Sequence, residues 1–242
     1  MTLTTDGARF YEKAFLVLGA IEAAEAWVGL AGKAEGVLRI TAPLTLAESR
    51  VIPMLTRFLA ANPKIEIDFT ASNHAFNLVA DNLDLAIRVG KLTDSRLVAR
   101  KVGLARRIAV ASPDYLDRAG RPVQPSDLAH HNCISCSLLG AGFNWAFQDG
   151  ASVVINGNFR ADSSHVLRSA ALGGIGIAVN ARWLFENDIA SGALEIVLPE
   201  TAPAPMPIHL LLPPGRFVAA RTCILVEFLV EEFARDTLLA ND

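Results

Sequence analysis

Hydrophobic and polar residues fall into blocks that predict strands and helices in turn along most of the chain. The elements predicted for the first half are, in order, a strand at 37–42, a helix at 45–61, a strand at 64–71, a short helix near 74–81 and a strand at 83–89. Asn62-Pro63 ends the first helix, because the residue before a proline is disfavoured in helical conformation. This β-α-β-α-β order predicts an α/β fold with a parallel sheet and helices on both faces.

A second run of alternating elements begins near Ile108. Its predicted elements are a strand at 108–111, a helix starting at Ser112-Pro113-Asp114, strands at 133–135, 144–147 and 153–159, a helix at 163–172, a strand at 175–179, a helix at 181–188 and a strand at 193–197. Gly173-Gly174 ends the helix predicted at 163–172. Prolines then bracket one apolar strand at 208–212, where we expect the chain to cross back, and a final helix is predicted at 217–235.

The opening stretch has a different pattern. Between Ala8 and Ala31 apolar residues recur in alternating steps of four and three, which is the seam of a heptad helix. A long helix of this kind at a terminus is typical of packing against a second copy of the same chain. The alternative is an ordinary helix that faces the core of its own chain.

Composition narrows the class of protein. With 242 residues, 52% hydrophobic and 19% charged, the chain is long and apolar enough to fold as one large unit or two lobes, and intrinsic disorder is excluded. The net charge of −3 argues against a domain whose own surface binds nucleic acid. There is no run of 18 apolar residues and no secretory signal pattern, so we expect a cytoplasmic protein that does not enter a membrane.

Cysteine and histidine positions give little support to redox or metal chemistry. The three cysteines fit a reducing cytosol. Cys133-Ile134-Ser135-Cys136 has the spacing of a thioredoxin-like pair, but on a strand an offset of three places the two side chains on opposite faces. His130-His131 has no third metal ligand nearby in the sequence. We therefore expect neither a metal nor another cofactor.

Polar residues gather where predicted strands end and helices begin. Thr41 ends the first strand, Thr45 is placed to cap the next helix, Ser72-Asn73 follows the second strand and Arg88 ends the third. In the second run, Asp162-Ser163-Ser164 opens a helix. Each residue alone could be a simple cap, and Arg88 could equally pair with Asp84 or Asp68. Together they favour a site for a carboxylate or phosphate, because ligands of open parallel sheets bind at the carboxyl ends of the strands.

Several segments in a fixed order resemble one family, the LysR-type transcriptional regulators. Residues 3–11 (LTTDGARFY) resemble the end of the family's winged helix-turn-helix, and GVLRITAP at 36–43 resembles the first strand of its effector domain. DLAIRVG at 84–90, SPDYL at 112–116 and AALGGIGIA at 170–178 follow in the family's order. The likeness extends over nearly the whole chain.

The resemblance implies a periplasmic-binding-protein-like fold of type 2, in which two Rossmann-like lobes are joined by two crossover strands, here near 103–108 and 205–211. The domain boundaries that it implies are a helix-turn-helix remnant at 1–7, a linker and dimerisation helix at 8–32, lobe I at 36–105 and 210–238, and lobe II at 106–209. It also implies a homodimer or homotetramer. Most of the helix-turn-helix is missing upstream, so we expect DNA to be bound only through that missing part.

The resemblance further implies a small organic effector, aromatic or carboxylate, held in the cleft between the lobes. By position its contacts are Thr41, Leu44, Thr45, Ser72, Asn73, Ser135 and Asp162, to which the strand-end pattern adds Arg88 and Ser163. Asp162 stands where relatives often carry asparagine, and a carboxylate there would repel an anionic effector. Two other functions remain open: a solute-binding protein of a transport system, and an enzyme with a two-lobed cleft, although no catalytic motif is present.

Overall fold

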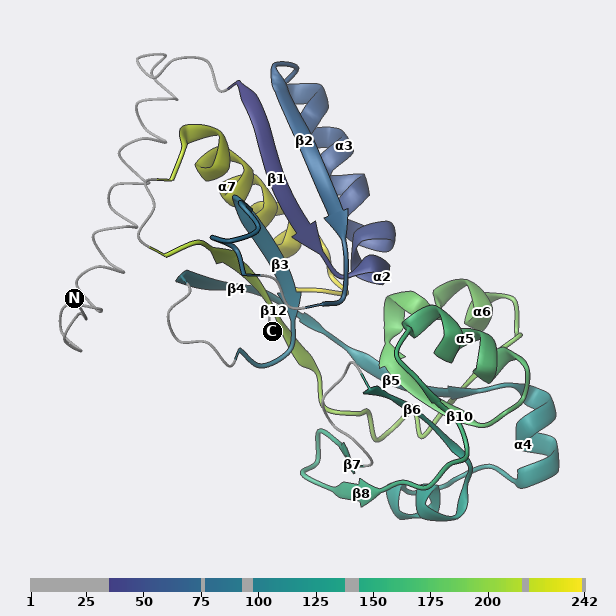
Figure 1. The fold of residues 1–242 in the computed structure, drawn as a ribbon. Coiled ribbons are helices and arrows are strands. Elements are labelled where there is room, and N and C mark those ends of the chain that lie inside the picture. Colours follow the sequence, from purple (N-terminus) through teal and green to yellow (C-terminus); the bar gives the residue numbers. More distant parts are fainter. Residues whose placement is uncertain (1–34, 75–76, 93–97, 138–143, 215–217, 241–242) are drawn as a thin grey trace, which may run out of the picture. The chain divides into compact units, whose positions relative to one another are not determined.

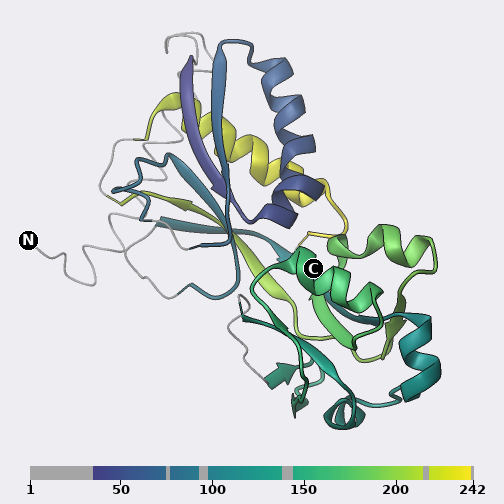
Figure 2. The same ribbon diagram turned by 45° about the vertical axis from the view of Figure 1, so that its right-hand side comes forward.

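The computed structural model forms two compact units, and each has its own five-stranded sheet (Figures 1 and 2). Unit 1 runs through Arg88 and also holds Leu92–Gly103 and Ile208 onward, and unit 2 holds Val89–Lys91 and Leu104–Pro207. The described residues are 35–74, 77–92, 98–137, 144–214 and 218–240. The helix expected at 8–32 lies outside them. No helix within these ranges is long and apolar enough to cross a membrane.

The sheet of unit 1 confirms the predicted parallel arrangement. Its strand order is β2-β1-β3-β12-β4, and β1 pairs in parallel with both β2 and β3. The strands are β1 (Gly36–Ala42), β2 (Ile65–Ala71), β3 (Leu85–Val89), β4 (Val98–Ala105) and β12 (Met206–Leu212). Because β1, β2 and β3 run the same way, the residues that follow them are brought to one edge of the sheet.

Two helical segments lie on the same face of this sheet (Figures 1 and 2). The first is a continuous helical run formed by α2 (Leu44–Leu46), a π-helical segment (Ala47–Val51) and α3 (Ile52–Ala61). The second is α7 (Ala220–Arg235). The rings of Phe58 and Phe228 lie 5.3 Å apart between the helices, and Arg57 forms an ion pair with the buried carboxylate of Glu232.

Three expectations for unit 1 are wrong. Helices were expected on both faces of the sheet, but the two described helical segments lie side by side on one face. Thr45 is not a helix cap: the N-cap is Pro43, and Thr45 lies within the first turn. Ala47 N–H donates to the Pro43 carbonyl at 2.8 Å, so the helix starts one residue earlier than predicted. A helix was expected near 74–81, but residues 78–81 form a turn. Asn77 N–H donates to the Asp81 carboxylate there at 2.9 Å. Asn and Asp side chains often stabilise turns in this way, in competition with helix formation.

The sheet of unit 2 combines parallel and antiparallel pairs in the order β11-β5-β10-β6-β9. β10 pairs in parallel with β6, and β6 pairs in parallel with β9, while β5 is antiparallel to β10 and to β11. The strands are β5 (Arg107–Ala111), β6 (Cys133–Cys136), β9 (Arg160–Ala161), β10 (Ile177–Ala181) and β11 (Glu195–Val197). A separate hairpin joins β7 (Asn144–Ala146) and β8 (Ser152–Val154).

Helices cover both faces of this sheet. α4 (Pro113–Ala119) begins at Ser112, whose side chain accepts a hydrogen bond from Tyr115 N–H, as its Ser-Pro start predicts. The other helices are α5 (Ser164–Leu172), α6 (Glu186–Ala190) and the 3₁₀ segments Pro125–His130 and Arg182–Leu184.

The two cysteines of β6 point to opposite faces, as the offset of three predicts. Cys133 packs with Tyr115 and Trp145 in one apolar cluster, and Cys136 packs with Leu167 and other residues in a second. Both thiols are buried and unbridged. Burial raises the pKa of Cys133 to about 12, so a reactive thiolate is disfavoured there.

Element boundaries in unit 2 differ from the predictions at several places. β11 starts at Glu195, two residues later than expected. Only the start of the strand expected at 153–159 is regular, because β8 ends at Val154 and β9 begins at Arg160, after the expected range. The helix expected at 181–188 is divided into a 3₁₀ turn and α6. The strand expected at 175–179 is β10, two residues later. β10 starts late because Ile175 N–H donates to the Ala170 carbonyl at 3.1 Å. Residue 175 therefore still belongs to the C-terminal cap of α5.

A hydrogen-bond chain links α4 to the start of β6. The hydroxyl of Tyr115 accepts the backbone N–H of Asn132 at 2.9 Å and lies 3.1 Å from Nδ1 of His131. Since this oxygen already accepts one hydrogen bond, its own proton is available to a neutral His131 Nδ1. Burial lowers the pKa of His131 from its ordinary value, and nearby His130 lowers it further, while Asp127 opposes the shift.

We expect acid to destabilise unit 2 through His131. A histidine with a lowered folded-state pKa takes up its proton more readily when unfolded, so stability falls as pH drops below about 6.5 and levels off below the folded pKa. Trp145 and Trp183 are both buried in unit 2, so urea unfolding followed by tryptophan fluorescence measures this effect. His131→Gln should flatten the loss between about pH 7.5 and about pH 5.5. Equal slopes for the variant and the wild type would disprove the assignment.

Candidate functional site

The predicted site residues of unit 1 meet at the carboxyl edge of the sheet. Ser72 N–H donates to the Ala42 carbonyl at 2.9 Å, which holds the end of β2 beside the end of β1. The Asn73 side chain accepts from Leu44 N–H at 3.4 Å, so the loop after β2 caps the helix that follows β1. Thr45 lies in that first helical turn.

Arg88 holds this loop from the end of β3. Its guanidinium donates to the carbonyl of Ser72 at 3.4 Å, to that of His74 at 3.2 Å and to that of Ile87 at 3.2 Å. Burial lowers the pKa of Arg88, but an arginine remains protonated at neutral pH. The arrangement therefore places a partly desolvated positive charge next to Ser72 and Asn73.

The sequence also allowed Arg88 to pair with Asp68 or Asp84. Both of these carboxylates contact Arg39 instead: Asp68 lies 3.6 Å from its Nε, and Asp84 accepts its backbone N–H at 2.9 Å. Arg88 itself donates to the backbone carbonyls of the loop after β2 and of Ile87.

Thr41 has an unusual position among these residues. It is fully buried at the end of β1, and its hydroxyl has no hydrogen-bond partner within the described part of the chain. Burying a hydroxyl without a partner costs about 1–3 kcal/mol. A ligand that hydrogen-bonds to Thr41 would recover part of that cost.

The predicted residues of unit 2 also lie close to one another. Ser135 is buried in β6 and is paired in register with Arg160 of β9. Asp162 follows β9 and is exposed, and Ser163 is the N-cap residue of α5, although its side chain makes no capping bond. Since β6 and β9 are parallel, these residues share one edge of the sheet.

Two polar residues at this edge were not predicted as site residues. Asn180 is buried in β10, where its side-chain nitrogen donates to the hydroxyl of Ser164 at 3.2 Å and its oxygen accepts from Ala181 N–H at 2.7 Å. The sequence contains a feature that could have identified Asn180, because it is the single polar side chain in the apolar run at 177–181.

The described residues contain no group of three or more His, Cys, Asp or Glu side chains that could hold a metal ion. The predicted site residues supply hydroxyls, the amide of Asn73 and backbone groups, with the Arg88 guanidinium in unit 1 and the Asp162 carboxylate in unit 2. Such groups bind and orient a ligand by hydrogen bonding.

Known proteins with similar sequences and structures are transcriptional regulators. The family model described as LysR substrate binding domain matches residues 31–234. The HTH-type transcriptional regulator CrgA of Neisseria meningitidis is 32% identical over 240 residues, which are 98% of this chain and 80% of CrgA. The HTH-type regulator PtxR of Pseudomonas aeruginosa is 32% identical and matches 98% of this chain and 77% of its own length.

Solved structures give the same result. The structure of CrgA, a LysR-type regulator from Neisseria meningitidis, matches with a TM-score of 0.74 and 31% identity, covering 96% of this chain and 80% of that chain. The full-length structure of AphB, a virulence activator of Vibrio cholerae, matches with a TM-score of 0.70 and 29% identity, covering 95% and 80%. The fold is thus the periplasmic-binding-protein-like type 2 fold of these regulatory domains.

Proposed function

This chain belongs to the LysR family of transcriptional regulators, with its effector-binding domain at residues 31–234, and we propose that the polar strand-end groups of its two units bind a small organic effector. This family membership favours a regulator over the solute-binding protein of a transport system. The observation that carries the proposal is the buried, unpartnered hydroxyl of Thr41 beside the loop that Asn73 and Arg88 hold. A position of this kind is costly unless a ligand uses it.

The charges suggest what the effector carries. In unit 1 the Arg88 guanidinium and the helix start at Leu44 favour a carboxylate or another acceptor group. In unit 2 the exposed carboxylate of Asp162 disfavours a second anionic group and favours a hydrogen-bond donor. We therefore propose an organic acid with one acidic group and a separate hydroxyl, amide or amine. Leu44, Thr45, Ser72, Ser135 and Ser163 complete the proposed set of contacts.

The effector would act by population shift. A ligand that binds one arrangement of the two units more tightly than another favours that arrangement. We propose that residues 8–32 pass this change to helix-turn-helix domains in a cytoplasmic homodimer or homotetramer, with residues 36–105 and 210–238 as one lobe and 106–209 as the other. DNA would be bound through the helix-turn-helix alone. The chain would not turn the effector over, because no nucleophile and base converge among the described strand-end groups.

Thr41→Val separates ligand binding from stability. Valine has nearly the same shape as threonine, so removing the unpartnered hydroxyl should leave unfolding stability equal or raise it by about 1 kcal/mol. The affinity for an effector should nevertheless fall about tenfold, the usual consequence of losing one good hydrogen bond. Thermal-shift screening of aromatic and aliphatic carboxylic acids, followed by titration of each hit, measures both quantities.

The matched control is Thr56→Val. Thr56 is exposed on α3, and its hydroxyl donates to the carbonyl of Ile52 at 2.9 Å within the helix. This variant should bind every hit as the wild type does. If Thr41→Val also bound the hits with unchanged affinity, the proposed site would be wrong.

A further inference from the structure

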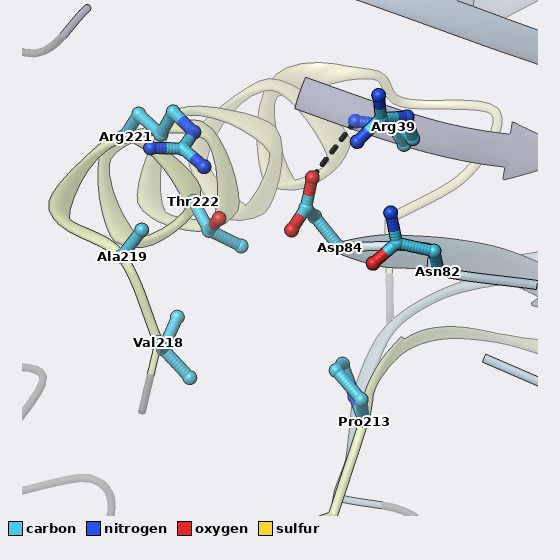
Figure 3. A pocket seen from close by; sticks show the side chains of 8 residues that line it. All are labelled: Arg39, Asn82, Asp84, Pro213, Val218, Ala219, Arg221 and Thr222. Carbon is cyan, nitrogen blue, oxygen red and sulfur yellow. Dashed lines mark hydrogen bonds between the residues drawn. The ribbon is translucent and has the colours of Figure 1, made fainter. Parts of the chain in front are cut away.

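A pocket of about 230 Å³ opens in unit 1 (Figure 3). Its polar walls come from β1, from the residues just before β3 and from the first turn of α7. The lining residues are Arg39, Asn82, Asp84, Pro213, Val218, Ala219, Arg221 and Thr222. None of them belongs to the set predicted for the effector. Asp84 precedes β3, whereas Arg88 lies near that strand's carboxyl end, so the pocket lies toward the amino ends of the parallel strands.

The Arg221 guanidinium is held in place by one hydrogen bond, and its other N–H groups can donate to a ligand. Its Nε donates to the carbonyl of Val37 at 3.1 Å, at the beginning of β1. Among the described residues no carboxylate pairs with Arg221, so its terminal nitrogens remain available to a ligand. Figure 3 shows this guanidinium at the wall of the pocket, on the first turn of α7.

Asp84 offers the opposite charge in the same pocket. Its Oδ2 accepts the backbone N–H of Arg39 at 2.9 Å, and its own N–H donates to the Arg39 carbonyl at 2.8 Å, so its position is fixed by β1. Its other oxygen, Oδ1, has no partner among the described residues. The guanidinium of Arg39 is balanced separately by Asp68, whose carboxylate lies 3.6 Å from it.

The pocket thus presents one fixed cation and one fixed anion that do not neutralise each other directly. A simple anion would be attracted by Arg221 and repelled by Asp84, and a simple amine would meet the reverse. A ligand that carries both charges satisfies both groups. The remaining wall, formed by Pro213, Val218 and Ala219, is apolar and suits a short aliphatic side chain.

We propose that this pocket is a second ligand site, which binds a small aliphatic α-amino acid as the zwitterion. The ligand carboxylate accepts hydrogen bonds from the terminal nitrogens of Arg221, and its ammonium group donates to Oδ1 of Asp84. The volume is below the roughly 300–1,000 Å³ of pockets for larger organic ligands, which agrees with a ligand of this size. This site is independent of the effector site proposed above.

The test uses the whole chain and ligands that differ by one charge. Glycine, L-alanine and L-valine are titrated calorimetrically up to about 10 mM, beside N-acetyl-L-alanine, which lacks the ammonium, and L-alaninamide, which lacks the carboxylate. We expect the zwitterions to bind and each blocked form to bind at least about tenfold more weakly, because each loses one charge-assisted hydrogen bond. Equal binding of a blocked form, or no binding of any zwitterion at about 10 mM, would overturn the proposal.

Variants locate the binding. Asp84→Asn keeps an oxygen for Arg39 N–H, and Arg221→Gln removes the guanidinium; each should weaken L-alanine binding about tenfold or more. Matched controls are Asp117→Asn and Arg100→Gln, which change exposed ion pairs outside the pocket and should leave binding unchanged. Thr41→Val should also leave it unchanged, since that residue belongs to the effector site. Loss of L-alanine binding in Thr41→Val, or its retention in both pocket variants, would overturn the assignment.

Discussion

Replacing Gly176 with alanine is expected to lower the unfolding free energy of unit 2 by about 3 kcal/mol, a large share of the roughly 5–15 kcal/mol that stabilises a typical domain. A Cβ atom at this position would lie 2.1 Å from the carbonyl oxygen of Asn132 and 2.9 Å from its carbonyl carbon. Both are backbone atoms that no side-chain rotation moves. The same oxygen accepts the N–H of Ile177 at 2.9 Å, so relieving the clash also weakens the bond at the start of β10.

Gly173→Ala is the matched control in the same loop. Gly173 has φ of −74°, which any residue adopts, and its added Cβ would meet the Ser169 carbonyl oxygen at 3.4 Å, an ordinary contact. This variant should stay within about 0.5–1 kcal/mol of the wild type, because alanine also restricts the unfolded chain. Urea unfolding followed through Trp145 and Trp183 gives both values. Equal stability of the two variants would show that the backbone contact at Gly176 is not limiting.

Replacing Arg168 with methionine should cost about 2–3 kcal/mol. Its Nε donates to Asp188 Oδ2 at 2.6 Å and its Nη2 donates to Oδ1 at 2.5 Å, which makes a bidentate pair between α5 and α6. The Asp188 side chain is only 8% exposed, so the variant leaves a buried carboxylate without its cation. The Arg168 side chain is 34% exposed, and this solvent contact keeps the loss below that of a fully buried pair.

A double variant tests whether the unpaired carboxylate of Asp188 causes the loss of stability. Arg168→Met combined with Asp188→Leu removes both charges and should recover most of the loss. Arg121→Met provides the surface comparison, since Arg121 is 53% exposed and pairs with Asp117 and Glu195, and it should cost clearly less than Arg168→Met because solvent screens these pairs. Losses of equal size for Arg168→Met and Arg121→Met would mean that burial of Asp188 has no effect on the pair.

The elements that the sequence predicts well are those in which local pattern and tertiary packing agree. β1 and β2 follow clear apolar runs, and α4 starts at Ser112 because a serine cap and a proline at the next position both favour it. The opposite directions of Cys133 and Cys136 follow from strand geometry alone.

Other features depend on contacts that sequence spacing does not contain. Thr45 has the side chain of a good cap, yet Pro43 takes the N-cap position and Asn73 of the neighbouring loop accepts the first helical N–H. Asn180 becomes relevant only because β10 lies beside α5, where it meets Ser164. The grouping of strand-end residues within each unit was expected from parallel topology, whereas the joint contact of one ligand with both groups stays a prediction.

The placement of the cysteines gives this protein a natural attachment point for an optical probe. Cys133 and Cys136 are buried, and Cys223, on α7 of unit 1, is the partly exposed thiol, so a maleimide dye should modify it first. Two indole donors, Trp145 and Trp183, belong to unit 2, and Trp27 can be changed to phenylalanine. Energy transfer from these indoles to a dye on Cys223 would then serve as a molecular ruler, which records directly whether an effector changes the separation of the two units.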